Sequence, residues 1–174
     1  MNRATPRLLL STTLLLLCAC SARRKDAGER PAARAAGADE PRIKGAAFVA
    51  TPELATVRFP YDRDELTPEA RRTLKKNAAV IGANRSWEVL VEGHCDERGT
   101  VAYNLALGQK RAKAVRDYYL ALGVAGSRVA TRSLGEESGE CAEATDACWE
   151  RNRRAVSKVR AAVAVRPGGA KRHE

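Results

Sequence analysis

The sequence is poor in aromatic residues, methionine and histidine, and none of its hydrophobic runs is long enough to span a bilayer. Only 5% of the 174 residues are aromatic, so a core must consist mainly of alanine, valine and leucine. The formal net charge is +10, but the basic residues concentrate at the two ends of the chain. Nucleic-acid binding usually needs a clustered basic patch with aromatic rings. We therefore expect no nucleic-acid partner.

The residues that could carry chemistry lack the spacing of a familiar metal or catalytic site. A metal site would need His94, Cys95, Cys141 and Cys148 to converge, and their spacing matches no zinc pattern. A histidine base beside a cysteine nucleophile is also disfavoured, because His94 and Cys95 are neighbours at a strand end and point to opposite faces. We expect no metal, no cofactor and no enzymatic activity, and we interpret His94 as a packed, hydrogen-bonded residue.

Residues 1–19 have the pattern of a secretory signal peptide. Basic residues precede an apolar run that is too short to cross a bilayer, and the run ends in Leu-Cys-Ala-Cys. This ending resembles a lipobox, in which a small residue such as Ala19 precedes the lipidated cysteine, here Cys20. Ser21 then favours sorting to the outer membrane in bacteria with two membranes. An ordinary signal peptide cleaved nearby is the alternative.

The composition changes after the signal peptide. Residues 20–50 are rich in alanine, arginine, glycine and acidic residues, and they have too few large apolar side chains to fold alone. We interpret them as a lipidated N-terminus followed by a disordered tether. Residues 51–165 then form one folded domain, and residues 166–174 form a basic C-terminal tail.

Strand and helix patterns alternate within the domain. Strands are predicted over 54–61, 87–91, 129–134 and 155–163. A Thr-Pro-Glu sequence starts one helix at residue 67. The core face of a second helix is predicted to contain Leu105, Gly108, Ala112, Val115, Tyr119 and Leu122. This order predicts an α+β two-layer sandwich, with helices packed on one side of a mixed four-stranded sheet.

The loop and helix after residue 91 bring a carboxylate and a guanidinium into the same region. Asp96 lies at the carboxyl end of the strand, and Arg111 lies beside the core face of the following helix. If that helix packs over the sheet, Asp96 can accept from an ammonium group while Arg111 holds a carboxylate. The pair would then receive a zwitterion. The alternative is an internal salt bridge that only orients the loop.

Three segments carry a family resemblance: EGHCDERGT at 92–100, YNLALGQKRAKAV at 103–115 and NRRA at 152–155. They resemble the OmpA-like peptidoglycan-binding domain, in particular its peptidoglycan-associated lipoprotein (Pal) branch. The resemblance implies that Asp96 and Arg111 bind meso-diaminopimelate of the peptidoglycan stem peptide. It also implies that the protein tethers the outer membrane to the wall, as a partner of TolB and other Tol proteins in envelope constriction and cell division.

The resemblance also extends the expected site. Tyr61 and Asp62 match the end of the family's F-x-F-D segment, and Asn104 matches a position that we expect to bind the loop backbone. In the N-R-R segment, we expect a structural role for Arg153 and a mixed role for Arg154. The predicted ligand-binding set is Asp96, Arg111, Asp62, Tyr61, Arg98, Asn104 and Arg154.

Export also bears on the cysteines, because an exported protein meets an oxidising compartment. Cys141 and Cys148 flank a short loop, so we predict a disulfide that contributes about 2–3 kcal/mol. Cys95 then stays unpaired.

Two other functions remain open: a general OmpA-like wall anchor without Tol partners, which the basic tail allows, and a wall-active enzyme that uses His94.

Overall fold

The computed structural model describes residues 47–161. The signal peptide, the lipidated Cys20, most of the tether and the basic C-terminal tail lie outside the described residues, and the predictions for them stay predictions. Between residues 47 and 161, no helix is long and apolar enough to cross a membrane.

The described residues form one mixed sheet, with β3 (Trp87–His94) between two long neighbours. β5 (Arg154–Ala161) runs antiparallel to β3, and β4 (Val129–Gly135) runs parallel to it. The short strands β1 (Val49–Ala50) and β2 (Val57–Arg58) pair with the other edge of β5. The helices are α1 (Pro68–Ala83), α2 (Val101–Ala121), the 3₁₀ turn η2 (Gly126–Arg128) and α3 (Asp146–Asn152).

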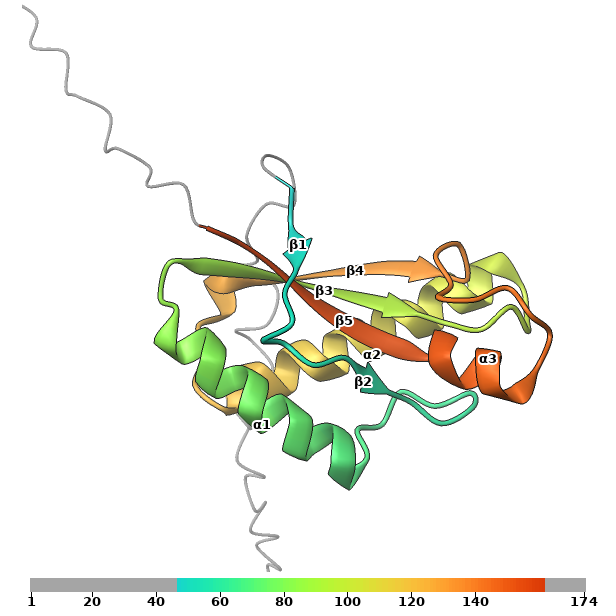
Figure 1. The fold of residues 1–174 in the computed structure, drawn as a ribbon, viewed down its shortest axis with the longest axis horizontal. Coiled ribbons are helices and arrows are strands. Elements are labelled where there is room, and N and C mark those ends of the chain that lie inside the picture. Colours follow the sequence, from blue (N-terminus) through green and yellow to red (C-terminus); the bar gives the residue numbers. More distant parts are fainter. Residues whose placement is uncertain (1–46, 162–174) are drawn as a thin grey trace, which may run out of the picture. The chain divides into compact units, whose positions relative to one another are not determined.

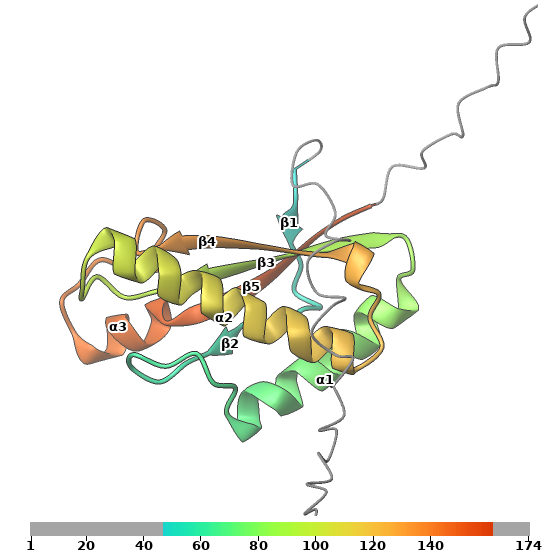
Figure 2. The same ribbon diagram turned by 180° about the vertical axis from the view of Figure 1, so that it is seen from behind.

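The helices α1 and α2 cover one face of this sheet, which confirms the predicted α+β sandwich (Figures 1 and 2). The sheet has five strands in the described residues, where the sequence predicted four. The additional strand is β1, in which Val49 pairs with Val159 of β5, so regular structure begins inside the range assigned to the tether. The predicted strand over 54–61 shrinks to two residues, and Pro60 after it cannot donate to a ladder.

The core lies between the sheet and these two helices. Val89 and Val91 of β3 face it, as their alternation predicted, and both are fully buried. Tyr119 of α2 is one of the few aromatic residues in the core, and its hydroxyl bonds with Ser157 of β5 (2.9 Å) and Asn77 of α1 (3.2 Å). Each buried polar group of this set therefore has a partner.

The buried face of α2 differs from the prediction. Leu105 and Leu122 are 37% and 38% exposed, and two arginines occupy buried positions instead. The reason is a close contact between backbones: a Cβ at Gly93 of β3 would lie 1.9 Å from the carbonyl oxygen of Gly108 on α2. This contact sets the face that α2 turns to the sheet: Asn104, Leu107, Gly108, Arg111, Ala112, Val115, Arg116 and Tyr119.

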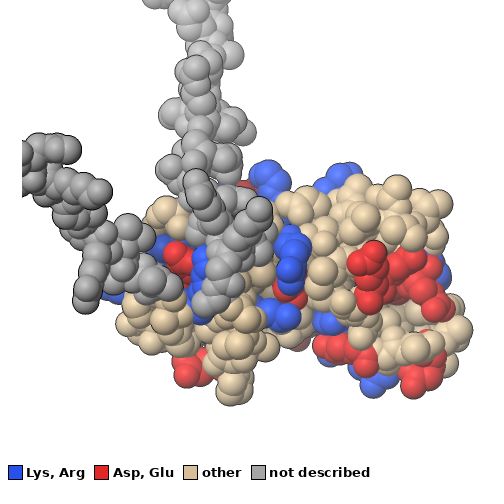
Figure 3. All heavy atoms as spheres, turned by 90° about the horizontal axis from the view of Figure 1, so that it is seen from above, with Lys and Arg blue, Asp and Glu red and all other residues tan. Residues whose placement is uncertain are grey.

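The opposite face of the sheet carries charged side chains (Figure 3). Glu92 of β3 is 1% exposed and pairs with Lys158 of β5 at 2.9 Å and with Arg132 of β4. Burial raises the pKa of Glu92, but the bonds from these two cations outweigh burial and hold the pKa below its usual value.

His94 lies next to Glu92 on this face and is 3% exposed. Its Nε2 is 3.9 Å from a carboxylate oxygen of Glu92, and neither ring nitrogen has a hydrogen-bond partner within the described chain. The prediction of a packed histidine is confirmed, and the predicted hydrogen bond reduces to a contact with the Ser138 backbone that falls short of hydrogen-bond geometry. Burial, followed by the charge of Arg154, lowers the pKa of His94 to about 4.

Candidate functional site

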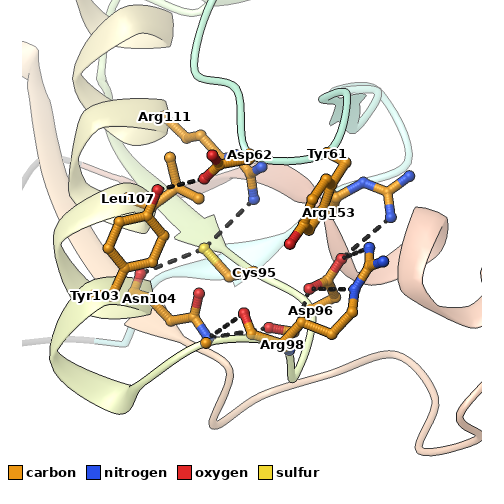
Figure 4. A pocket seen from close by; sticks show the side chains of 11 residues that line it. Tyr61, Asp62, Cys95, Asp96, Arg98, Tyr103, Asn104, Leu107, Arg111 and Arg153 are labelled. Carbon is orange, nitrogen blue, oxygen red and sulfur yellow. Dashed lines mark hydrogen bonds and ion pairs between the residues drawn. The ribbon is translucent and has the colours of Figure 1, made fainter.

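A cavity of about 200 Å³ opens at the carboxyl end of β3 (Figure 4). Three parts of the chain enclose it: the loop after β2, the loop between β3 and α2 with the first turns of α2, and the residue that follows α3. Its lining residues are Tyr61, Asp62, Cys95, Asp96, Arg98, Gly99, Tyr103, Asn104, Leu107, Arg111 and Arg153.

The local sequence explains why α2 starts beside this cavity. Gly99 has a φ of 120° and turns the chain, and the Thr100 hydroxyl then caps α2 by accepting from the Tyr103 amide (3.2 Å). The contact between Gly93 and Gly108 holds the first half of α2 against β3. Arg111 follows one turn later and therefore faces the end of the strand.

Arg111 is fully buried and joins two backbone segments, the loop after β2 and the end of β3. Its guanidinium donates to the carbonyl oxygens of Arg63 (2.8 Å), His94 (2.8 Å) and Pro60 (3.2 Å). A guanidinium has five N–H groups, so one on each terminal nitrogen is left over. The one on Nη1 has only the Cys95 sulfur, at 3.4 Å, as a weak acceptor. Burial lowers the pKa of Arg111. The N–H groups on its terminal nitrogens that have no oxygen acceptor in the described residues could donate to a carboxylate.

Asp96 does not pair with Arg111, so the alternative of an internal salt bridge between them is wrong. Its Oδ2 accepts from Arg98 Nη2 (2.7 Å) and Arg153 Nη1 (3.2 Å), and its Oδ1 accepts from the Arg98 amide (3.3 Å). Burial raises the pKa of Asp96, but the bonds from both arginines outweigh burial and hold the pKa below its usual value. The cavity thus contains an ionised carboxylate and three guanidinium groups.

Two aromatic rings and a second carboxylate complete the wall. The guanidinium carbon of Arg98 lies 4.0 Å from the centroid of the Tyr61 ring. Asp62 has a φ of 54°, a left-handed conformation that aspartate tolerates better than most residues, and it accepts from the Tyr103 hydroxyl. That bond raises the pKa of Tyr103.

The structure brings six of the seven predicted ligand-binding residues to the cavity and leaves out Arg154. Arg154 is 6% exposed and binds the Ser138 carbonyl (3.0 Å) and the Glu140 carboxylate (3.2 Å) on the other face of the sheet. Arg153 lines the cavity instead. It lies between α3 and β5, whereas Arg154 is the first residue of β5. Asn104 donates to the carbonyl oxygens of Asp96 (3.2 Å) and Arg98 (3.3 Å), as predicted for a residue that binds the loop backbone.

The cysteines are distributed as expected from the sequence. Cys141 and Cys148 form a disulfide with a Cα–Cα distance of 5.8 Å, and Cys95 is a free, buried thiol that lines the cavity. Burial raises the pKa of Cys95. His94 is not part of the lining, so the cavity does not join it to Cys95.

Sequence reasoning missed five lining residues: Cys95, Gly99, Tyr103, Leu107 and Arg153. Tyr103 lies one position before the predicted Asn104, at the start of α2, where the first turn faces the loop. The spacing along the helix could have indicated Leu107, because it lies one turn before Arg111.

Comparisons with known proteins indicate the family of the chain. The model of the OmpA family matches residues 58–154. The peptidoglycan-associated lipoprotein of Haemophilus influenzae is 36% identical over 156 residues, which is 90% of this chain and 98% of that protein. That of Mesorhizobium japonicum is 42% identical over 101 residues, and the chain spans only 60% of its length.

Among solved structures, the peptidoglycan-associated lipoprotein of Burkholderia pseudomallei is 36% identical and superimposes with a TM-score of 0.59, over 60% of this chain and 89% of that one. The family match covers more than half of the chain and includes every residue that lines the cavity. The chain therefore belongs to the OmpA family.

Proposed function

We propose that this protein is an envelope lipoprotein that binds peptidoglycan noncovalently through meso-diaminopimelate in the cavity at the end of β3. The single observation that carries the proposal is that Asp96 and Arg111 line the same cavity, where a carboxylate and a guanidinium can each face one end of a zwitterion. The relatives are named peptidoglycan-associated lipoproteins, which supports peptidoglycan as the binding partner.

In this proposal Arg111 binds the carboxylate of diaminopimelate. Each terminal nitrogen has one N–H group beyond its carbonyl bond, and neither group has an oxygen acceptor among the described residues. The ammonium group of the ligand would replace the Arg153 guanidinium, whose contact with Asp96 Oδ2 (3.2 Å) is longer than that of Arg98 (2.7 Å). Asp62 and Tyr61 would border the ligand from the loop after β2, and Arg98 and Asn104 would shape the opposite wall.

We further propose that Cys20 carries the lipid, that residues 20–50 serve mainly as a tether from the outer membrane, and that TolB and other Tol proteins are partners in envelope constriction. The name of the relatives, peptidoglycan-associated lipoprotein, supports the lipid anchor and the wall contact of this proposal. An enzyme that uses His94 is the weaker alternative, because that side chain is buried on the face of the sheet away from the cavity.

A sacculus pull-down tests the proposal with the non-lipidated chain from residue 21 to residue 174. Asp96→Ala and Arg111→Lys are compared with wild type on diaminopimelate walls and on lysine-type walls. Truncating Asp96 removes one partner of a desolvated charged contact, which costs about 2–5 kcal/mol. Lysine at position 111 keeps the charge but loses the planar fork that binds a carboxylate. Each variant should therefore stay in the supernatant. We choose lysine at position 111 because alanine would leave three carbonyl groups without their donor.

Arg116→Lys is the matched control. Arg116 is also buried on α2, where it donates to the Val129 carbonyl (2.9 Å), and it does not line the cavity. This variant should pellet with the walls like wild type. If folded wild type binds neither wall, or if Arg116→Lys fails as Arg111→Lys does, the proposed ligand site is wrong. For the wider role, TolB should compete with sacculi for binding to this chain, and Cys20→Ala in the full-length protein should be lost from the membrane fraction.

A further inference from the structure

The short helix α3 does not line the cavity, but one of its side chains contacts a residue that does. The ring of Trp149, on α3, lies 4.2 Å from the guanidinium carbon of Arg98, and the ring of Tyr61 lies 4.0 Å from the same carbon. Arg98 is thus held between two aromatic faces while it donates to Asp96 at 2.7 Å. Trp149 Nε1 also donates to Glu97 (3.1 Å) in the same loop.

The helix α3 cannot hold this position through its own stability. It has seven residues, whereas isolated helices need about 12–15 residues even for marginal stability. Only Cys148 and Asn152 of α3 are buried. Both bind the same preceding segment: Cys148 through the disulfide to Cys141, and Asn152 through its amide group, which donates to the Cys141 carbonyl at 3.0 Å.

We propose that Trp149 is a positioning residue for the ligand cavity and that the Cys141–Cys148 disulfide holds Trp149 over Arg98. The tryptophan follows the second cysteine directly, so the crosslink fixes the turn of α3 that carries the ring. Through Arg98, the ring fixes the orientation of the Asp96 carboxylate before a ligand enters. This inference rests on the proposed function, since it concerns affinity at the same site.

The test measures the protein concentration that gives half-maximal pelleting with diaminopimelate sacculi. Trp149→Ala should raise this concentration about 2- to 5-fold, the equivalent of one partly exposed cation–π contact. Trp149→Phe should restore most of the loss, because phenylalanine keeps a ring over Arg98. Trp87→Phe, which changes the other tryptophan of the chain, is the matched control and should bind like wild type.

The disulfide is tested with the Cys141→Ser/Cys148→Ser variant, whose folding is verified by circular dichroism. It should lose about as much affinity as Trp149→Ala, and adding Trp149→Ala to it should cost nothing more, because both changes act through the same contact. The proposal would be overturned if the serine variant bound with wild-type affinity, or if the affinity losses of the serine variant and Trp149→Ala added up in the combined variant. Asn152 would then suffice to hold α3.

A second readout does not depend on wall binding. In a Trp87→Phe background, Trp149 is the only tryptophan, and its fluorescence should shift when the two cysteines are replaced and also in Arg98→Gln. Unchanged emission in the serine variant would overturn the proposal even if sacculi bind. If wild type fails to bind sacculi, the proposed function fails, and the emission still decides whether the disulfide positions Trp149.

Discussion

Replacing His94 by leucine should remove part of the domain's sensitivity to acid. The pKa of His94 falls from 6.5 to about 4 on folding, since its ring is buried. Between these pH values the unfolded chain binds a proton that the folded chain does not, so the free energy of unfolding decreases as the pH falls through this window. The full shift corresponds to about 3 kcal/mol, of which about 2 kcal/mol is already lost at pH 5.

Urea unfolding at pH 7 and pH 5 measures this effect. His94→Leu leaves no hydrogen-bond partner unsatisfied, because neither ring nitrogen makes a hydrogen bond in the described residues. Glu92, Arg154 and Lys158, the charged groups around the ring, are the same in both proteins. Wild type should therefore lose about 2 kcal/mol more than His94→Leu between the two pH values. His173→Gln, which removes the other histidine, is the control. An unchanged pH dependence in His94→Leu would refute the reasoning.

Two further predictions concern packing. Gly108→Ala should destabilise the domain by about 1–3 kcal/mol and weaken wall binding, because the new Cβ would separate α2 from β3; urea unfolding and pelleting measure both effects. Its control is Gly82→Ala on α1, where a Cβ meets nothing within 4 Å, and a gain of about 0.4–1 kcal/mol is expected. Tyr119→Phe should cost about 1–2 kcal/mol in thermal or urea unfolding, because its hydroxyl bonds to Ser157 and Asn77. Wild-type stability in Gly108→Ala or Tyr119→Phe would contradict these assignments.

Local patterns predicted the parts of the fold that are long and periodic. The alternation of Val89 and Val91 predicted β3, and the Thr-Pro-Glu sequence at 67–69 predicted the start of α1. The helix α3 was missed because its seven residues carry no apolar period and depend on a disulfide for their position. The strand β1 was missed because two residues beside an alanine-rich segment give no strand signal until β5 pairs with them.

The sequence predicted which residues line the site better than it predicted the hydrogen bonds and ion pairs between them. The strand, loop and helix order predicted that Asp96 and Arg111 would meet if the helix packed over the sheet, and both residues line one cavity. The partners of Asp96 were not predictable, because Arg153 reaches it from a segment 57 positions further along the chain. The sequence predicted Arg154 as a site residue, but Arg153 lines the cavity. Successive side chains of a strand point to opposite faces, so an error of one residue in the start of β5 reverses which arginine faces the cavity.

The three carbonyl bonds of Arg111 have a consequence for the kinetics of attachment. They fix the backbone of Pro60, Arg63 and His94 around one side chain, so this side of the cavity has its shape before a ligand arrives. A ligand that enters such a preorganised cavity spends little free energy on ordering the protein. Variants that loosen this side should therefore release the wall faster, while their rate of capture stays close to that of wild type.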